Sequence, residues 1–284
     1  MLAEYTTLIR SPRTDIKLML AMLDDPFCAE EIKKGIKSVD HLLALIDKVP
    51  SNRFTSTSLS RPEYPDFYGN LDLHHLDIVE LVTDMLQDPR FEGHIHLTPQ
   101  KDVRAGTRFV SEYVTGTHYE NMYNVYAADG AYVCAVGLVS DATVISMSGS
   151  LSVHPMYCYL YNVSSVVRWK KGGVRLCALL PAIPGTPPQR KQDQHTKDRR
   201  EVFHAAITHI VRRLESAGGI RYVDRAGIHR LVYMHLVGYL GDYPEMCKVC
   251  CVYEGVNAQI PCNNCTCPTH QLQDVELEWP RRTK

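Results

Sequence analysis

The sequence predicts a mixed α/β fold (α+β) in which helices flank a mixed sheet, with a helical region before it and a small cysteine-rich segment after it. Three observations lead to this prediction. Apolar residues recur at helical spacing in the first fifty residues, they form short continuous runs between residues 131 and 240, and six of the ten cysteines fall between Cys247 and Cys267. These features divide the chain into residues 1–60, 61–245, 246–270 and 271–284.

The composition excludes several classes of protein. With 45% hydrophobic residues among 284, the chain can bury a real core, which argues against wholesale disorder. The formal net charge of -1 lacks the basic excess common among nucleic-acid binders, so any DNA contact must come from a local basic patch or from bridging metal ions. No signal peptide or membrane span is recognisable, and we therefore expect an intracellular protein with reduced cysteines.

The expected helices and connecting segments of the amino-terminal third follow from apolar spacing. Residues at every third or fourth position share a helix face, and Pro50 and Asp88-Pro89 are stop signals. We expect helices over Asp15–Leu23, Ala29–Val49 and Asp72–Gln87, with a polar linker over Ser51–Asp66.

Apolar runs of strand length dominate the middle of the chain. The run from Ala131 to Val139 is nearly all small or β-branched, which is typical of a fully buried strand. Further strands are expected over Thr143–Ser148, Met156–Val163 and Val174–Leu180, then a helix over Glu201–Ser216 and a hairpin formed by Ile220–Val223 and Ile228–Leu240.

A polar, basic stretch from Pro184 to Arg200 is expected to form a mobile loop. It is interpreted either as a solvated loop or as a DNA contact, and its candidate DNA-binding residues are Arg190, Lys191, Lys197, Arg199 and Arg200.

Two of the buried runs are each followed by an aspartate, Asp141 and Asp242. Carboxylates are preferred ligands of Mg²⁺ or Mn²⁺, and polynucleotidyl transfer uses two such cations roughly 4 Å apart. The order strand-Asp, strand, strand, helix, strand-Asp fits a ribonuclease-H-like plan in which the two carboxylates share a metal. The alternative is that each aspartate is a turn former or a helix cap, as we expect for Asp129 and Asp224.

The cysteine cluster contains two pairs with the spacing of zinc knuckles. Cys247 and Cys250 form one pair and Cys262 and Cys265 the other, which suits a closed structural Zn²⁺ site. The adjacent Cys251 leaves the register open, because it can replace Cys250. Cys267 and His270 are further candidates, and a metal-free cluster of thiols is the alternative.

One block of the chain runs from Gly241 to Cys247 and continues with Cys250-Cys251 and Pro261–Cys265. Shorter motifs, in chain order between Tyr64 and Cys265, are Asp88–Phe91, Ser111–Gly116, Ser140–Thr143, His154–Tyr157, Asn162-Val163, Ala217–Ile220 and Asp224–Gly227. Together these motifs resemble those of a family of mobile-element proteins, the Plavaka-type transposases of the Kyakuja-Dileera-Zisupton and CACTA-like group. The block that starts at Gly241 is the strongest, because it is similar to the family's "DYPEQC…CC…CPxC" segment.

The resemblance implies a ribonuclease-H-like nuclease with an acidic triad, acting on transposon-end DNA in the nucleus. Asp141 would be the first acid and Asp242 the second, while no residue is assigned to the third, a glutamate in the family. Ala142 replaces the family's usual lysine. The resemblance therefore implies a truncated or remnant copy that is inactive alone, without a small-molecule substrate, and compatible with homo-oligomers. The alternative function is a non-enzymatic, zinc-stabilised module that binds DNA or protein.

Overall fold

The computed structural model describes residues 54–127, 129–144, 152–170, 172–183, 192–224, 227–252, 258–274 and 278–282. The chain divides into two units, residues 1–53 and 54–284, and everything below concerns the second. The two helices expected within the first fifty residues lie outside the described residues.

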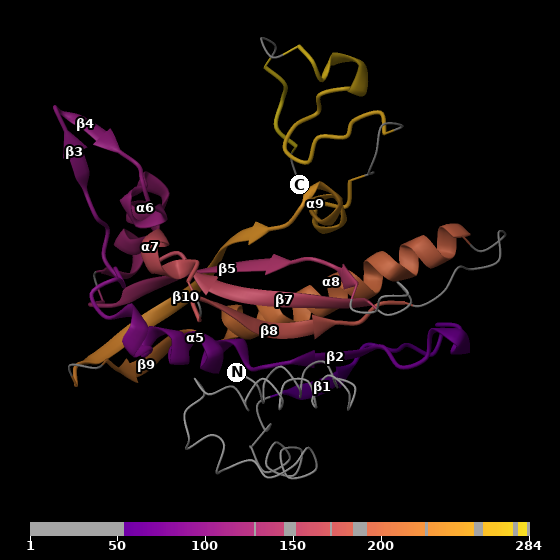
Figure 1. Cartoon of the computed structure of the whole chain (residues 1–284), viewed down its shortest axis with the longest axis horizontal. Helices are drawn as coiled ribbons and strands as arrows, with labels where there is room; N and C mark the ends of the chain where they lie inside the picture. The colour runs from indigo at the N-terminus through magenta and orange to yellow at the C-terminus, as the bar shows by residue number, and fades with distance from the viewer. Residues whose placement is uncertain are drawn as a thin grey trace, which may run out of the picture. The chain divides into compact units, whose positions relative to one another are not determined.

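Eight of the described strands form one sheet (Figure 1). In the order in which they neighbour one another, seven are β1 (Thr55–Ser58), β2 (Asp72–His75), β8 (Val174–Leu180), β7 (Ser152–Leu160), β5 (Tyr132–Ser140), β10 (His229–Leu240) and β9 (Gly219–Val223); the short β6 (Thr143–Val144) pairs with β7. Strands β5 and β10 run parallel, and the other pairs are antiparallel. The predicted mixed sheet is confirmed.

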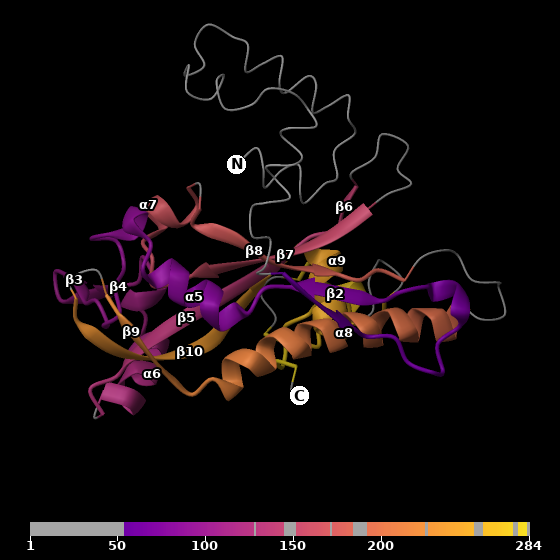
Figure 2. The ribbon, with the colours of Figure 1, turned by 90° about the horizontal axis from the view of Figure 1, so that it is seen from below.

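Helices cover both faces of this sheet (Figures 1 and 2). Along β5, alternate side chains point to opposite faces. Cys134 and Leu138 pack with α5 (Ile78–Leu86) and α8 (Gln192–Ser216), whereas Val133 packs against Tyr119 of α6 (Thr117–Ala127) on the other face. Two apolar layers thus enclose β5, which explains why its sequence is almost continuously hydrophobic.

The remaining elements are short. They are η1 (Asp66–Tyr68), η2 (Pro89–Phe91), a separate hairpin of β3 (Asp102–Arg104) and β4 (Thr107–Phe109), η3 (Tyr113–Thr115), α7 (Ser165–Arg168), α9 (Tyr243–Val249) and η5 (Thr269–Gln271).

The expected helix over Asp72–Gln87 is wrong in its first part. Strand β2 occupies Asp72–His75, and α5 begins only at Ile78. The side chain of Asp77 accepts hydrogen bonds from the backbone N–H groups of Val79 and Glu80, which fixes the start of the helix there. The linker expected over Ser51–Asp66 is also partly wrong, since it contains the edge strand β1.

Helix α8 begins nine residues earlier than the predicted Glu201, so Gln192–Arg200 is helical and not a mobile loop. Its first turns bury two polar side chains, His195 and Asp198, and Asp198 accepts a 2.8 Å hydrogen bond from the hydroxyl of Tyr68. Because His195 and Asp198 are polar, this buried face leaves no apolar periodicity in the sequence. None of the helices described combines the length and apolar content needed to cross a bilayer.

Candidate functional site

The two aspartates singled out in the sequence follow neighbouring parallel strands. Strands β5 and β10 pair up to Val139 and Leu240, and Asp141 and Asp242 each lie two residues beyond that pair. Both aspartates are exposed. Because parallel strands end at the same edge of a sheet, the pairing directs both residues to one edge, here called the carboxyl edge.

A β-bulge in β10 decides which face of the sheet Asp242 joins. Leu236 faces Val136, but Gly238 faces Gly137, so β10 contains one residue more than β5 at this point. Side chains alternate along a strand, and one inserted residue reverses the alternation.

The packing on either side of the bulge shows this reversal. Before it, the even-numbered Met234 packs into the core beneath α5 and α8; after it, the odd-numbered Tyr239 does. Continuing the new register by two residues puts Asp242 level with Asp141 and on the same face of the sheet. If β10 continued at its first register without the bulge, Asp242 would be level with Ala142, and the two carboxylates would face opposite sides.

Asp141 lies in an interruption of one continuous strand. Strand β6 keeps the register that β5 has against β7, with Thr143 facing Val153. The residue level with Asp141 on β7 is then Pro155, which has no N–H for the ladder. Hence β6 continues β5 and is not an independent strand, and the backbone of Asp141 lies between two paired stretches.

Asp242 is the N-cap of α9. This agrees with the alternative, drawn from the sequence, that each aspartate forms a turn or caps a helix. Its Oδ1 accepts a 2.8 Å hydrogen bond from the backbone N–H of Glu245. A carboxylate at this position is stabilised by the unpaired N–H groups of the first helical turn. The cap engages one carboxylate oxygen, and the second oxygen is the one suited to a cation.

The carboxyl edge contains a buried acid that the sequence analysis did not single out, Glu245. Its Oε1 accepts hydrogen bonds from Ser140 Oγ and from His154 Nε2, the latter at 2.8 Å, and its Oε2 lies 3.0 Å from Lys248 Nζ. Ser140 Oγ also lies 2.5 Å from the hydroxyl of Tyr239. One carboxylate therefore joins β5, β7 and α9, and reaches β10 through Ser140.

Glu245 remains charged despite its burial. Only 3% of its side chain is exposed, and this burial by itself raises the pKa. Hydrogen bonds from His154, Ser140 and Lys248, together with the electrostatic attraction of His154, outweigh it and lower the pKa of Glu245 to about 2. The available sequence signal was its position three residues after the cap Asp242, where an acid suits a helix amino terminus.

The candidate zinc ligands lie on and after α9. Cys247 is buried, whereas Cys250 and Cys251 are exposed at the end of the helix. The backbone N–H of Asn264 points to the sulfur of Cys262 at 3.4 Å, a contact that suits a thiolate. Across the described residues, no three Cys, His, Asp or Glu side chains are grouped as a metal site requires. The spacing fits zinc, but the sulfur positions do not form a closed site.

Cys251 has an additional neighbour on α8. Its sulfur lies 3.2 Å from Nε2 of His204, and the same nitrogen lies 3.0 Å from the carbonyl oxygen of Lys248. Since a carbonyl only accepts, Nε2 must carry the proton and act as the donor. His204 therefore caps the carboxyl end of α9.

A family model for the Plavaka transposase matches residues 37–284. The chain belongs to the Plavaka transposase family. No curated protein and no solved structure gave a match. The resemblance noted from the motifs is thus confirmed over most of the chain.

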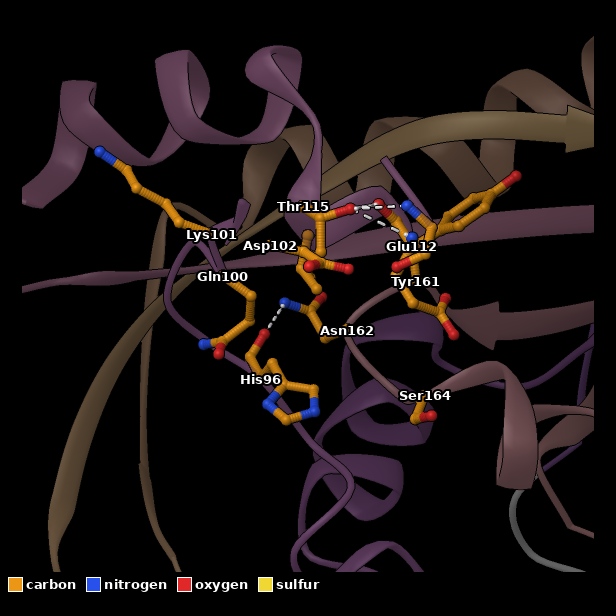
Figure 3. Close-up of a pocket in the computed structure, with 11 residues that line it drawn as sticks. His96, Gln100, Lys101, Asp102, Glu112, Thr115, Tyr161, Asn162 and Ser164 are labelled. Carbon is orange, nitrogen blue, oxygen red and sulfur yellow. Dashed lines mark hydrogen bonds between the residues drawn. The ribbon is translucent and has the colours of Figure 1, made fainter. Parts of the chain in front are cut away.

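One of the Plavaka-like motif residues, Asn162, has a clear structural role. It is fully buried, and its Oδ1 accepts a 2.6 Å hydrogen bond from the N–H of Ala135. Its Nδ2 lies 2.8 Å from the carbonyl oxygen of His96 (Figure 3). The same nitrogen lies 3.0 Å from both the Tyr119 hydroxyl and the Val133 carbonyl. Asn162 therefore joins the end of β7 to the amino end of β5.

A pocket of about 350 Å³ adjoins Asn162 (Figure 3). Since Asn162 contacts Ala135 near the start of β5, this pocket lies at the opposite end of the strand from Asp141. Its charged lining residues already have partners: Glu112 pairs with Arg168, and Lys101 lies 3.1 Å from Glu120. We therefore place the candidate site of this Plavaka protein at the carboxyl edge, where ligands of parallel strand pairs bind.

The candidate DNA-binding residues fall into two groups. Arg190 and Lys191 lie outside the described residues, whereas Lys197, Arg199 and Arg200 lie on α8. Lys197 is 3.8 Å from Glu201, a weak exposed pair. The helix presents these cations on a regular surface instead of a loop.

Proposed function

We propose that the carboxyl edge of β5 and β10 binds divalent cations through Asp141 and Asp242, in a ribonuclease-H-like core whose ancestral activity is metal-dependent DNA strand cleavage and transfer. The observation that carries this proposal is the register of the parallel pair, with the bulge that brings both aspartates to one face. The family supports transposase ancestry in general.

The sheet order supports the ribonuclease-H-like core. Strands β5, β7 and β8 form an antiparallel meander in chain order, and β10 pairs in parallel with β5 after the crossover through α8. This is the order strand-Asp, strand, strand, helix, strand-Asp expected from the sequence, with β9 added at the outer edge.

The residues of the edge suit cation binding. Mg²⁺ or Mn²⁺ bound there would polarise the attacking and leaving oxygens of a phosphodiester. The exposed carboxylates of Asp141 and Asp242 would hold it, while α9 orients Asp242 through the cap. We expect this chain alone to bind cations more readily than it cleaves DNA, because two carboxylates supply few of the ligands that two-metal chemistry uses.

Cation binding and nicking of supercoiled DNA test this proposal. Asp141→Asn and Asp242→Asn should each abolish saturable Mn²⁺ binding, measured by electron paramagnetic resonance, and any Mg²⁺- or Mn²⁺-dependent nicking. Asp129→Asn is the matched control, since Asp129 is an exposed turn residue before the other end of β5. Unaltered Mn²⁺ binding in both edge variants would rule out the site.

The alternative proposal is a non-enzymatic module, stabilised by zinc, that binds DNA or protein. It is favoured by the cysteine spacing and by the fact that no third acidic side chain joins Asp141 and Asp242 among the described residues. It predicts salt-dependent DNA binding that weakens in a Lys197→Ala/Arg199→Ala/Arg200→Ala variant and is unaffected by Asp141→Asn. If the protein cleaves DNA or binds it without cleavage, we expect it in the nucleus.

A further inference from the structure

Glu245 lies directly behind the two proposed cation ligands. Ser140 and Asp141 are successive residues, so Ser140 points into the core beneath α8 while Asp141 belongs to the opposite face. Glu245 accepts the hydrogen bond of Ser140, and its own N–H holds Oδ1 of Asp242 at 2.8 Å. A single residue thus contacts the backbone neighbour of one aspartate and the carboxylate of the other.

The packing around Glu245 is close on the α9 side as well. A Cβ atom added at Gly241 would come within 2.9 Å of both Cβ and Cγ of Glu245, so glycine is needed for the chain to pass. His154, which donates to Oε1, stacks at 5.7 Å on Phe203 of α8. The position of the carboxylate is therefore determined from β5, β7, α8 and α9 together.

Stability alone does not account for a buried charge here. Replacing a buried ionic cluster by well-packed apolar residues is often neutral or stabilising. What such a cluster offers, and an apolar side chain does not, is directional contacts that fix neighbouring groups.

We propose that Glu245 is a positioning residue, which fixes the tip of β5 and the start of α9 so that Asp141 and Asp242 present their carboxylates to one cation. This inference rests on the proposed cation site. Groups that orient metal ligands from behind typically change metal affinity by 10–100-fold when they are removed.

The test compares Mn²⁺ affinity in variants of the full chain, measured below the lowest melting temperature of the set. Glu245→Ala removes all the contacts of the carboxylate and should weaken Mn²⁺ binding about 10–100-fold. Glu245→Gln keeps an acceptor oxygen where Oε1 receives Ser140 and His154, so it should restore most of that affinity.

Asp88→Ala is the matched control for lost stability. Asp88 is another buried acid with a pKa of about 2, but its partners are Arg90 and Arg175 instead of the edge residues. It should lower the melting temperature without changing the Mn²⁺ affinity.

The outcomes separate this inference from the proposed function. If Asp141→Asn abolishes Mn²⁺ binding but Glu245→Ala leaves it unchanged, only the positioning role is overturned. A Glu245→Gln variant as damaging as Glu245→Ala, or an equal effect of Asp88→Ala, would overturn it too. Wild-type protein that binds no Mn²⁺ through Asp141 and Asp242 would remove both proposals.

Discussion

Asp88 and Arg175 form an ion pair across 87 positions of the chain. Asp88 also caps η2 through the N–H of Arg90 and lies 2.5 Å from that residue's guanidinium. The strongest cause of its low pKa is the hydrogen bonding of Arg90, with further lowering by the charge of Arg175, to about 2 from an ordinary value of 3.8. The carboxylate of Asp88 therefore connects the segment that follows α5 to β8.

Protonation of Asp88 should therefore destabilise the protein in acid. Because the folded pKa lies below the unfolded one, the stabilisation is complete above pH 4 and is lost as the pH falls from about 4 to about 2. Asp88→Asn should remove roughly 2 kcal/mol of the pH dependence in that window. Urea unfolding at a series of pH values would measure it, and parallel wild-type and variant curves would contradict it.

Two substitutions at Asp242 should separate its cap from its proposed cation role. Asparagine caps helices about as well as aspartate, whereas alanine loses about 1 kcal/mol of stability. Asp242→Asn should thus keep the wild-type melting temperature and lose Mn²⁺ binding, and Asp242→Ala should lose both. If Asp242→Asn binds Mn²⁺ normally, Asp242 acts as a cap and nothing more.

Gly137→Ala should destabilise the sheet by about 1–3 kcal/mol through overpacking. A Cβ atom at this position would lie only 2.2 Å from Cζ of Tyr159. Tyr159→Leu removes the ring, so in a double-mutant cycle the second substitution should recover much of the loss. Additive effects of the two changes would show that the ring is not the obstacle.

Asn162→Asp should cost about 3 kcal/mol or more at neutral pH, although the two side chains have nearly the same shape. Oδ1 would still accept from Ala135, but the second oxygen would face the carbonyls of His96 and Val133 where a donor now lies. Buried acceptors without a donor are strongly destabilising. Thermal unfolding measures this, with Asn124→Asp on the surface of α6 as the control.

The purified protein should contain bound zinc if the cysteine-rich segment is a zinc site. Elemental mass spectrometry should find about one Zn²⁺ per chain, reduced by Cys262→Ser or Cys247→Ser but not by Cys28→Ser. Metal-free protein that unfolds at the same temperature would exclude a structural zinc.

Elements with strong apolar patterns could be predicted from sequence, and polar ones could not. Strands β5 and β8 and the hairpin of β9 and β10 agree with their predicted runs, because both faces of these strands contact the core or a neighbour. Strand β1 consists of Thr55–Ser58, all hydroxyl residues at a sheet edge, and it resembles a linker in composition. The first turns of α8 were missed because their buried side chains are His195 and Asp198.

The candidate site was predictable only in outline. That Asp141 and Asp242 follow strands is visible in the sequence, and the crossover order makes them neighbours. The bulge at Val237 was not predicted. The available signal was Gly238, since an isolated glycine within a strand often marks a bulge, but it does not show which residue is the extra one. Glu245 was hidden for a different reason: its partners Ser140 and His154 lie 105 and 91 positions away.

The face of the sheet on which Asp242 lies depends on whether an odd or an even number of residues separates it from the bulge in β10, because side chains alternate along a strand. With the pairing at the bulge kept, adding one residue between the bulge and Asp242 would turn that carboxylate to the far side of the sheet, with the composition almost unchanged. Two-residue changes would restore its direction. Members of the family that keep the bulge should therefore differ in length only by even steps over the positions matching 237–241, and they should keep glycine at the position matching Gly241.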